Sequence, residues 1–173
     1  MVNGALIDLP DKVDRSVAEG VFELLFQAAR YGVGEGTQAK GMLLVIGSCD
    51  DFNKIGYCDE GMNTFEGTQI DVRNWKAFKK RILPCFVKDG AFCVDGKTGY
   101  IISDGFFINI SHKNADKGGG TGHRNASAAG AEGFLAIKCS EDSCATDGMG
   151  KKDLKVFSGT KVPTMVPVKP ENS

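Results

Sequence analysis

The organisation of the chain is decided by residues 118–140, which form the sequence GGGTGHRNASAAGAEGFLAIKCS. A run of glycines comes first, and a polar Thr-Gly-His-Arg group follows it. The small residues after that group favour a short helix over about 123–131. Gly133 then separates the helix from an apolar run, 134–140, which is too short for a usual helix and predicts a buried strand. We therefore expect a loop, a helix and a strand in direct succession.

The elements on both sides of this segment indicate a mixed fold. Apolar residues at helical spacing predict a helix over 13–31, and a glycine-bounded apolar run predicts a buried strand over 41–48. A second amphipathic helix is expected over 71–83, with Asp71 as its N-cap and Pro84 after its end. The fold class is therefore α/β in the wide sense (α+β), with helices flanking the sheet.

Further short strands make this sheet largely antiparallel. The turn-forming pairs Asp95-Gly96 and Asp104-Gly105 separate three strand-like runs, and the first two are expected to form a hairpin. The predicted strands are 91–94, 99–103, 106–110 and, near the end, 155–157. We expect a single domain over 1–162 and a flexible tail over 163–173, which carries prolines and a polar end.

The amino-acid composition limits the classes of function that are expected for this chain. The chain has 173 residues, of which 42% are apolar and 25% charged, and its formal net charge is −1. These values indicate one globular domain with a real core. Nucleic-acid polymers and anionic membranes select for a basic excess, so neither is expected as a partner. A small anionic ligand needs only a local group of donors and stays possible.

The six cysteines do not indicate a metal site or a disulfide framework. No two of them form a C-x-x-C pair, and the two histidines lack zinc-ligand spacing beside them. Cys93 and Cys139 lie in apolar runs, where a thiol behaves as a small hydrophobe. We expect reduced thiols and a cytoplasmic location, because the chain also lacks a signal peptide and an apolar run long enough for a bilayer.

The first of three polar clusters is Lys88-Asp89-Gly90-Ala91, at the entry to a predicted strand. An Asp before a Gly is commonly only a turn. The functional alternative is a carboxylate, Asp89, that holds a divalent cation against phosphate oxygens, with Gly90 allowing close approach of the backbone.

The second cluster is Gly120-Thr121-Gly122-His123-Arg124. Backbone N–H groups at a helix start make an anion site, and Arg124 and Thr121 can add donors to phosphate. The cluster is not a P-loop, because no Gly-Lys-Ser/Thr follows at the required spacing, and it is not a dinucleotide fingerprint. A plain flexible loop is the alternative.

The third cluster is Ser140-Glu141-Asp142, directly after a predicted strand. It is either a solvated acidic turn or a second source of carboxylate for metal or ribose. A metal-holding acid, a phosphate clamp and a further acid together suit nucleotidyl transfer, which must neutralise a triphosphate and orient an attacking hydroxyl.

These three clusters resemble the motifs of the diadenylate cyclase family, whose members condense two ATP into cyclic di-AMP. Family members carry Asp-Gly-Ala, then Arg-His-Arg preceded by Gly-Thr, then a motif like Ser-Glu-Glu. This chain has Asp89-Gly90-Ala91, residues 120–124 and Ser140-Glu141-Asp142 in the same order and at similar spacing. The resemblance covers about residues 13–157.

The resemblance implies roles for individual residues. Asp89 and Asp142 would hold Mg²⁺ or Mn²⁺, and Asp89, His123 and Arg124 would be catalytic. Phe107 would pack on the adenine. The other nucleotide contacts would be Gly90, Ala91, Gly120, Thr121, Ser140 and Asp142. ATP and cyclic di-AMP would be the ligands, and a homodimer would bring two ATP together.

One position departs from the family pattern: Gly122 stands where the first Arg of Arg-His-Arg is expected. Loss of a phosphate-binding guanidinium in a dry site lowers catalysis strongly. Lys113 and Lys117 are sequence candidates for the replacement charge. Two hypotheses follow: a diadenylate cyclase, or a catalytically degenerate domain of the same fold that binds or senses a nucleotide or cyclic dinucleotide.

Overall fold

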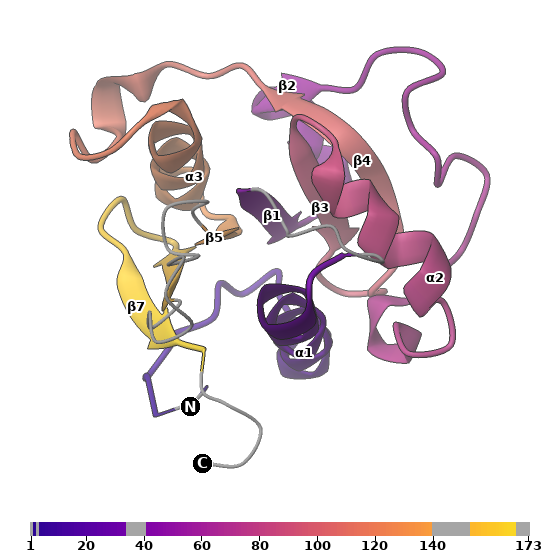
Figure 1. Cartoon of the computed structure of the whole chain (residues 1–173). Helices are drawn as coiled ribbons and strands as arrows, with labels where there is room; N and C mark the ends of the chain where they lie inside the picture. The colour runs from indigo at the N-terminus through magenta and orange to yellow at the C-terminus, as the bar shows by residue number, and fades with distance from the viewer. Residues whose placement is uncertain (1, 3, 34–40, 140–152, 169–173) are drawn as a thin grey trace.

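The computed structural model describes residues 2, 4–33, 41–139 and 153–168 (Figure 1). Within these ranges the chain forms a seven-stranded sheet of order β2-β4-β3-β1-β5-β6-β7. Strands β1 and β3 are parallel, and the other neighbouring strands pair antiparallel. The expected mixed, largely antiparallel sheet is confirmed. The strands are β1 (Met42–Gly47), β2 (Gly56–Tyr57), β3 (Ala91–Asp95), β4 (Ile101–Ile108), β5 (Leu135–Cys139), β6 (Asp153–Ser158) and β7 (Thr164–Pro167).

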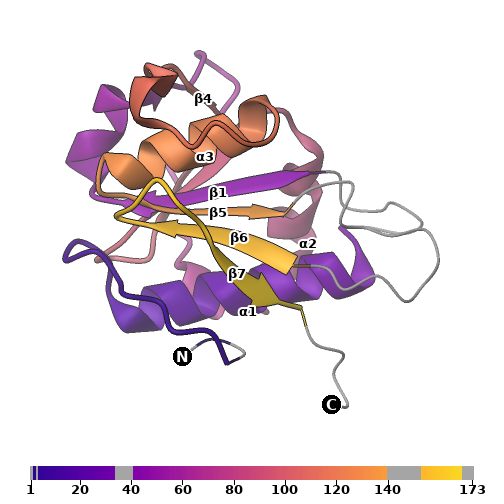
Figure 2. The ribbon, with the colours of Figure 1, turned by 90° about the vertical axis from the view of Figure 1, so that its left-hand side faces the viewer.

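Helices cover both faces of the sheet. Figure 2 shows α3 (Thr121–Ala131) on one face and α1 (Arg15–Tyr31) on the other. Both helices were predicted close to their observed bounds. The short elements are α2 (Lys79–Ile82) and the 3₁₀ segments η1 (Cys49–Lys54), η2 (Val72–Asn74), η3 (Leu83–Val87) and η4 (His112–Asn114).

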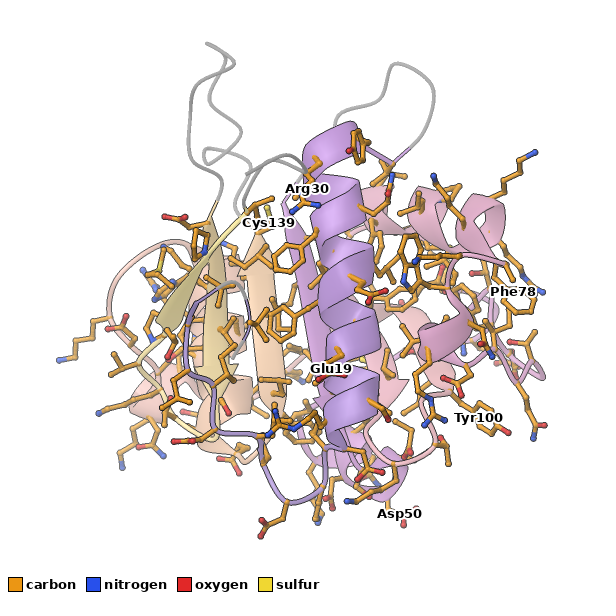
Figure 3. All side chains as sticks on the ribbon, turned by 90° about the horizontal axis from the view of Figure 1, so that it is seen from below. Glu19, Arg30, Asp50, Phe78, Tyr100 and Cys139 are labelled. Carbon is orange, nitrogen blue, oxygen red and sulfur yellow. The ribbon has the colours of Figure 1, made fainter. Side chains whose placement is uncertain are left out.

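The two faces bury different kinds of side chain. Large apolar residues of α1, such as Val21 and Leu24, pack with Leu44 of β1 in one core cluster, and Figure 3 shows α1 lying along the sheet. The other cluster joins Ala126 and Ala129 of α3 to strand residues that include Phe157. Alanines allow α3 to approach the sheet closely, and this short approach brings the loop before α3 near the strand ends.

The predicted helix over 71–83 is wrong. Asp71 does cap the segment, since its carboxylate accepts a hydrogen bond of 2.9 Å from the Arg73 N–H. However, that cap starts only η2, and helical structure resumes at α2 before η3 begins at Leu83. Asp71 also forms a bridge with Tyr100, and Arg73 donates to the Thr98 carbonyl at 3.0 Å. These long-range contacts hold the segment in short turns against its helical periodicity.

The predicted break at Asp104-Gly105 is also wrong, because β4 continues through both residues. The pairing of β3 with β4 shifts register between Ala91 and Cys93, as at a β-bulge, and Gly105 has a φ of 69°. The Asp104 side chain is buried rather than exposed in a turn. A bulge lets one strand take up the extra residues without ending.

The tail predicted from Pro163 onward is wrong for its first residues. Thr164–Pro167 form β7, which pairs antiparallel with β6 at the edge of the sheet. An edge strand tolerates proline because one side of its backbone makes no ladder hydrogen bonds. Val166 is fully buried there, which explains why this segment joins the sheet.

The structure also bears on the expectations about membrane-spanning helices and about the cysteines. In the part of the chain that the structure describes, no helix is long and apolar enough to cross a membrane. Cys93 and Cys139 are buried, as expected for thiols in apolar strands.

Candidate functional site

A cleft of about 250 Å³ opens at the end of the sheet where β1 and β3 begin and β4 and β5 end. The first motif lines it with Gly90 and Ala91, and the second lines it with Gly122. Phe107, the residue expected to pack on a base, lines it from β4. The fold therefore brings two sequence motifs and the candidate base contact to one cleft.

Gly90 is required by the backbone at this point. Its φ is 98°, in the region that favours glycine, and a Cβ there would lie 2.8 Å from the Phe106 carbonyl oxygen. This close approach carries the chain into β3 directly against β4. Asp89, immediately before Gly90, has an exposed side chain, so its carboxylate is accessible next to the cleft.

An ion pair between Lys88, which is partly exposed, and a buried carboxylate holds the segment before Asp89. The ammonium of Lys88 lies 2.7 Å from Asp104, whose side chain is only 1% exposed. Thr64 donates to the same carboxylate from its N–H at 2.8 Å and from its hydroxyl at 2.6 Å. Burial alone would raise the pKa of Asp104, but Lys88 and Thr64 stabilise the charged form and lower it. Lys88 is therefore directed to β4 and fixes the entry to the first motif.

We expect the Asp104→Asn variant to lose about 1–3 kcal/mol of unfolding free energy at neutral pH, because it breaks this pair. The folded-state pKa of Asp104 is lowered, so its stabilisation is fully present above the ordinary carboxyl pKa and is lost as pH falls through the lowered value. The gap between wild type and variant should therefore shrink below about pH 4. Urea unfolding from pH 7 to pH 3 measures it, and a gap independent of pH would contradict the assignment.

The second motif begins α3. Gly120 is the N-cap, with extended backbone, and no side chain caps the helix. The first intrahelical hydrogen bond runs from the Arg124 N–H to the Gly120 carbonyl at 3.1 Å. The N–H groups of residues 121–123 therefore have no carbonyl partner within the helix, and they form the positive end of its dipole. Gly122 places this end at the cleft.

His123 is directed away from the cleft lining and into the core. Its side chain is 6% exposed, and its Nε2 lies 2.9 Å from the Asp116 carboxylate. The imidazole contacts Phe157 edge-on at 5.3 Å between ring centres. The hydrogen bond from His123 lowers the pKa of Asp116. Ser127 extends the network by accepting from the Asp116 N–H at 2.6 Å. His123 thus anchors the loop before α3.

Because His123 is packed and hydrogen-bonded, we expect His123→Ala to cost about 2–3 kcal/mol of unfolding free energy. Any affinity for ATP, the ligand expected from the sequence motifs, should fall less than about tenfold, since the imidazole does not line the cleft. Glu132→Ala, at an exposed position at the other end of α3, is the control and should cost less than about 1 kcal/mol. A His123→Ala variant with wild-type stability and no ATP binding would instead establish a direct ligand contact.

The other site residues predicted from the sequence lie beside the cleft or outside the described residues. Arg124 and Thr121 have exposed side chains beside Gly122, and neither is among the residues that line the cleft. Gly120 is exposed at the helix start. The third cluster, with Ser140 and Asp142, lies outside the described residues, although the strand that leads to it, β5, ends at this same edge.

Comparisons with known proteins bear on the fold. No family model and no curated protein matches the chain. Among solved structures, DacA from Staphylococcus aureus, a diadenylate cyclase, is similar at 17% identity and a TM-score of 0.51, over 87% of this chain and 85% of that one. This chain shares its fold with DacA. A hypothetical membrane spanning protein from Bacillus cereus is similar at 14% identity and a TM-score of 0.55 over 90% of this chain. The chain spans 65% of that protein's length.

Sequence reasoning missed two polar residues of the cleft in this DacA-like fold: Lys138 of β5 and Asn125 of α3. The oxygen Oδ1 of Asn125 lies 2.6 Å from Nε2 of His112, which fixes the amide in place. Lys138 carried a detectable signal, because it is the one charged residue in the apolar run 134–139. Lys113 and Lys117, the lysines favoured from sequence, are exposed and do not line the cleft.

Phe107 has an aromatic neighbour at the edge of the DacA-like sheet. Tyr57 of β2 pairs with it in register, and the two rings lie 5.8 Å apart between centres, tilted by 35°. Tyr57 is 51% exposed. An exposed aromatic ring next to Phe107 adds apolar surface on which a base can pack.

A larger pocket of about 490 Å³ lies elsewhere, between the end of α1 and the α2–η3 segment. Its lining includes Tyr31, Lys79 and Leu83 and no residue of the three motifs. We assign the candidate site to the smaller cleft, because residues of the first and second motifs line it together.

Of the two metal ligands predicted from the sequence, Asp89 is described by the structure and Asp142 lies outside the described residues. No group of three or more His, Cys, Asp or Glu side chains gathers within the described ranges. Mg²⁺ does not need such a group, because it is commonly held by one or two carboxylates together with substrate phosphates. The exposed carboxylate of Asp89, next to the cleft, fits that requirement.

Proposed function

We propose that this domain is a metal-dependent diadenylate cyclase, which condenses two ATP into cyclic di-AMP. The observation that best supports this proposal is the cleft that Gly90, Phe107 and Gly122 line together, in a fold shared with DacA. Residues from three separate segments of the chain meet there. Aromatic surface for a base and helix N–H groups for phosphates support the proposal that the cleft binds a nucleotide.

Each part of the cleft has a defined task in this proposal. Phe107 packs on the adenine, and the backbone at Gly90 approaches the nucleotide closely because no side chain intervenes. The N–H groups at the start of α3, together with Thr121 and Arg124, donate to phosphate oxygens. His123 positions this helix start through Asp116 and contacts no ligand itself. Ser140 belongs to the same site by its motif.

The reaction forms one bond and breaks one bond for each ATP. The 3′-hydroxyl of one ATP attacks the α-phosphorus of the other, and the bond from that phosphorus to the β-phosphate bridging oxygen breaks. Pyrophosphate leaves, and the hydroxyl proton passes to a base. Asp89 and Asp142 would hold Mg²⁺ or Mn²⁺, which supplies charge neutralisation at the phosphates. Orientation of the two ATP molecules supplies the rest.

A homodimer is part of this proposal. Ring closure requires two nucleotides to face each other, and each copy would supply one nucleotide from its candidate cleft. A volume of about 250 Å³ is smaller than the roughly 300–1,000 Å³ of sites that enclose a ligand. A half-site that a second copy completes accounts for this size.

Gly122 favours a second candidate function. The family's Arg at this position contributes a guanidinium that the chain lacks, so the cleft could bind a nucleotide or cyclic di-AMP without forming product. The domain would then act as a sensor. This alternative uses the same cleft and the same fold and differs only in turnover.

The deciding experiment incubates the purified protein with ATP and Mn²⁺, then with ATP and Mg²⁺, with GTP in parallel. Mass spectrometry detects cyclic di-AMP and pyrophosphate. Product from ATP supports the cyclase. Tight binding of ATP or cyclic di-AMP by calorimetry without product supports the sensor, and absence of both product and binding contradicts both functions.

A further inference from the structure

Asn125 connects helix α3 to the segment that follows β4. It lies three residues after Gly122, so the two positions share one face of α3, and both line the cleft. Its side chain is directed to η4, which packs against α3 after β4 ends: Oδ1 of Asn125 lies 2.6 Å from Nε2 of His112. Asn125 therefore lies on the side of α3 that faces the end of β4, where Phe107 lines the cleft.

The hydrogen bond to His112 fixes the direction of the Asn125 amide. An amide oxygen only accepts, so Nε2 of His112 donates to Oδ1. The other end of the amide, Nδ2, carries two N–H donors. Among the residues that the structure describes, no group accepts a hydrogen bond from Nδ2. Because Asn125 is half-buried in the cleft lining, the cleft contains an oriented donor that no described protein group pairs.

Local preference does not explain an asparagine at this position. Asn is among the weaker helix formers, because its amide competes for backbone hydrogen bonds. The residues that follow it in α3, from Ala126 to Ala129, are small, and an alanine at position 125 would suit the helix better. A residue that goes against the preference of its own element is typical of a functional position.

The position of Asn125 matches the middle of a nucleotide bound as proposed. In that arrangement the base packs on Phe107, the phosphates contact the N–H groups at the start of α3, and the ribose joins the two. Asn125 lies about one turn beyond the start of α3 and is held by His112, which follows Phe107 by five residues. The sugar is therefore the part of the nucleotide expected next to this amide.

We propose that Asn125 recognises the ribose, with Nδ2 donating a hydrogen bond to a sugar hydroxyl oxygen, and that His112 positions the amide for this contact. The inference rests on the proposed function, since it takes the ligand to be a nucleotide. It names the substrate class more closely, as a ribonucleotide rather than a deoxyribonucleotide. A hydroxyl oxygen accepts a hydrogen bond, and a site that pairs with it discriminates against an analogue that lacks the hydroxyl.

The test is calorimetric titration of the whole protein with ATP, 2′-deoxy-ATP and 3′-deoxy-ATP, without added metal ion so that ATP is not consumed. We expect wild type to bind at least one deoxy analogue about three- to tenfold more weakly than ATP, the effect of one neutral hydrogen bond. Asn125→Ala should bind ATP as weakly as that analogue, so that the ratio of the two affinities falls to about one. Asn114→Ala removes an exposed amide that does not line the cleft, and it should keep the wild-type ratio.

Variants of His112 test its positioning role. His112→Ala leaves the amide of Asn125 able to rotate, and we expect the affinity ratio between ATP and the deoxy analogue to fall below about two. His112→Gln keeps an N–H donor for Oδ1 and should restore the wild-type ratio. A purely structural role of His112 would lower all affinities together, so an unchanged ratio in His112→Ala would contradict positioning.

The outcomes separate this inference from the proposed function. If wild type neither binds ATP nor forms product with Mn²⁺ or Mg²⁺, the nucleotide function fails and the ribose contact fails with it. If wild type binds ATP and both deoxy analogues equally well, or if Asn125→Ala keeps the wild-type ratio, the function stands and the role of Asn125 is wrong. An equal loss of all three affinities in Asn125→Ala also contradicts a ribose contact, because the ratio is then unchanged.

Discussion

Replacement of Asp89 by Asn is expected to lower the rate of cyclic di-AMP formation by at least about 100-fold, with ATP affinity reduced less than about tenfold. Asn keeps the size of the side chain and removes the charge that Mg²⁺ or Mn²⁺ requires of its ligand. The side chain is exposed, so no packing is lost with the charge. Binding and turnover should therefore separate in this variant.

The measurement is the initial rate of product formation at saturating ATP, with calorimetry for the affinity. Asp11→Asn removes an exposed carboxylate near the N-terminus, outside the three motifs, and serves as the control. Its rate of product formation should match that of wild type. Equal unfolding free energies for both variants would confirm that the fold is intact. An Asp89→Asn rate within about threefold of wild type would remove the metal-binding role assigned to Asp89.

Replacement of Gly130 by Ala should destabilise the protein by about 2–3 kcal/mol, at the upper end of the cost of overpacking. Helix propensity alone predicts the opposite sign, because Ala is favoured over Gly by about 1 kcal/mol inside a helix. Here the new Cβ would lie 2.4 Å from the Thr160 carbonyl oxygen and 2.6 Å from Cβ of Phe157. Neither atom is the end of a flexible side chain, so α3 must move off β6.

The same helix supplies a matched comparison. Gly122→Ala adds an identical methyl group, but its nearest neighbour is the flexible end of Lys138, which can move aside. We expect a change between zero and about 1 kcal/mol in the stabilising direction. Urea unfolding of both variants gives the two signs directly. A Gly130→Ala protein as stable as wild type would mean that α3 does not pack against β6 as closely as described.

Local sequence patterns were sufficient for the strands that are buried along most of their length and for the two long amphipathic helices. The run 42–47 forms β1 and the run 135–139 forms β5, because short apolar segments between glycines or polar residues are stable only as buried strands. Helices α1 and α3 follow from their periodicity in the same way. The order of the motifs along the chain also indicated the fold that the chain shares with DacA.

The direction of individual polar side chains depended on the tertiary structure. The sequence predicts that His123, beside Arg124, contacts a ligand. In the structure its imidazole is buried, where it hydrogen-bonds Asp116 and packs against Phe157. In the sequence, Lys138 is only a charged residue within a predicted strand. In the structure, the antiparallel pairing of β5 with β1 and the packing of α3 place its side chain next to Gly122.

The physical reason is the range of the forces involved. Periodicity records which residues must leave water, and that requirement is local to each helix or strand. A cleft is made where separate elements end side by side, so its charges are set by strand register and helix packing. The sequence by itself therefore determined strands β1 and β5, helices α1 and α3, and the order of the motifs. The tertiary structure decided that Gly122 and Lys138 belong together.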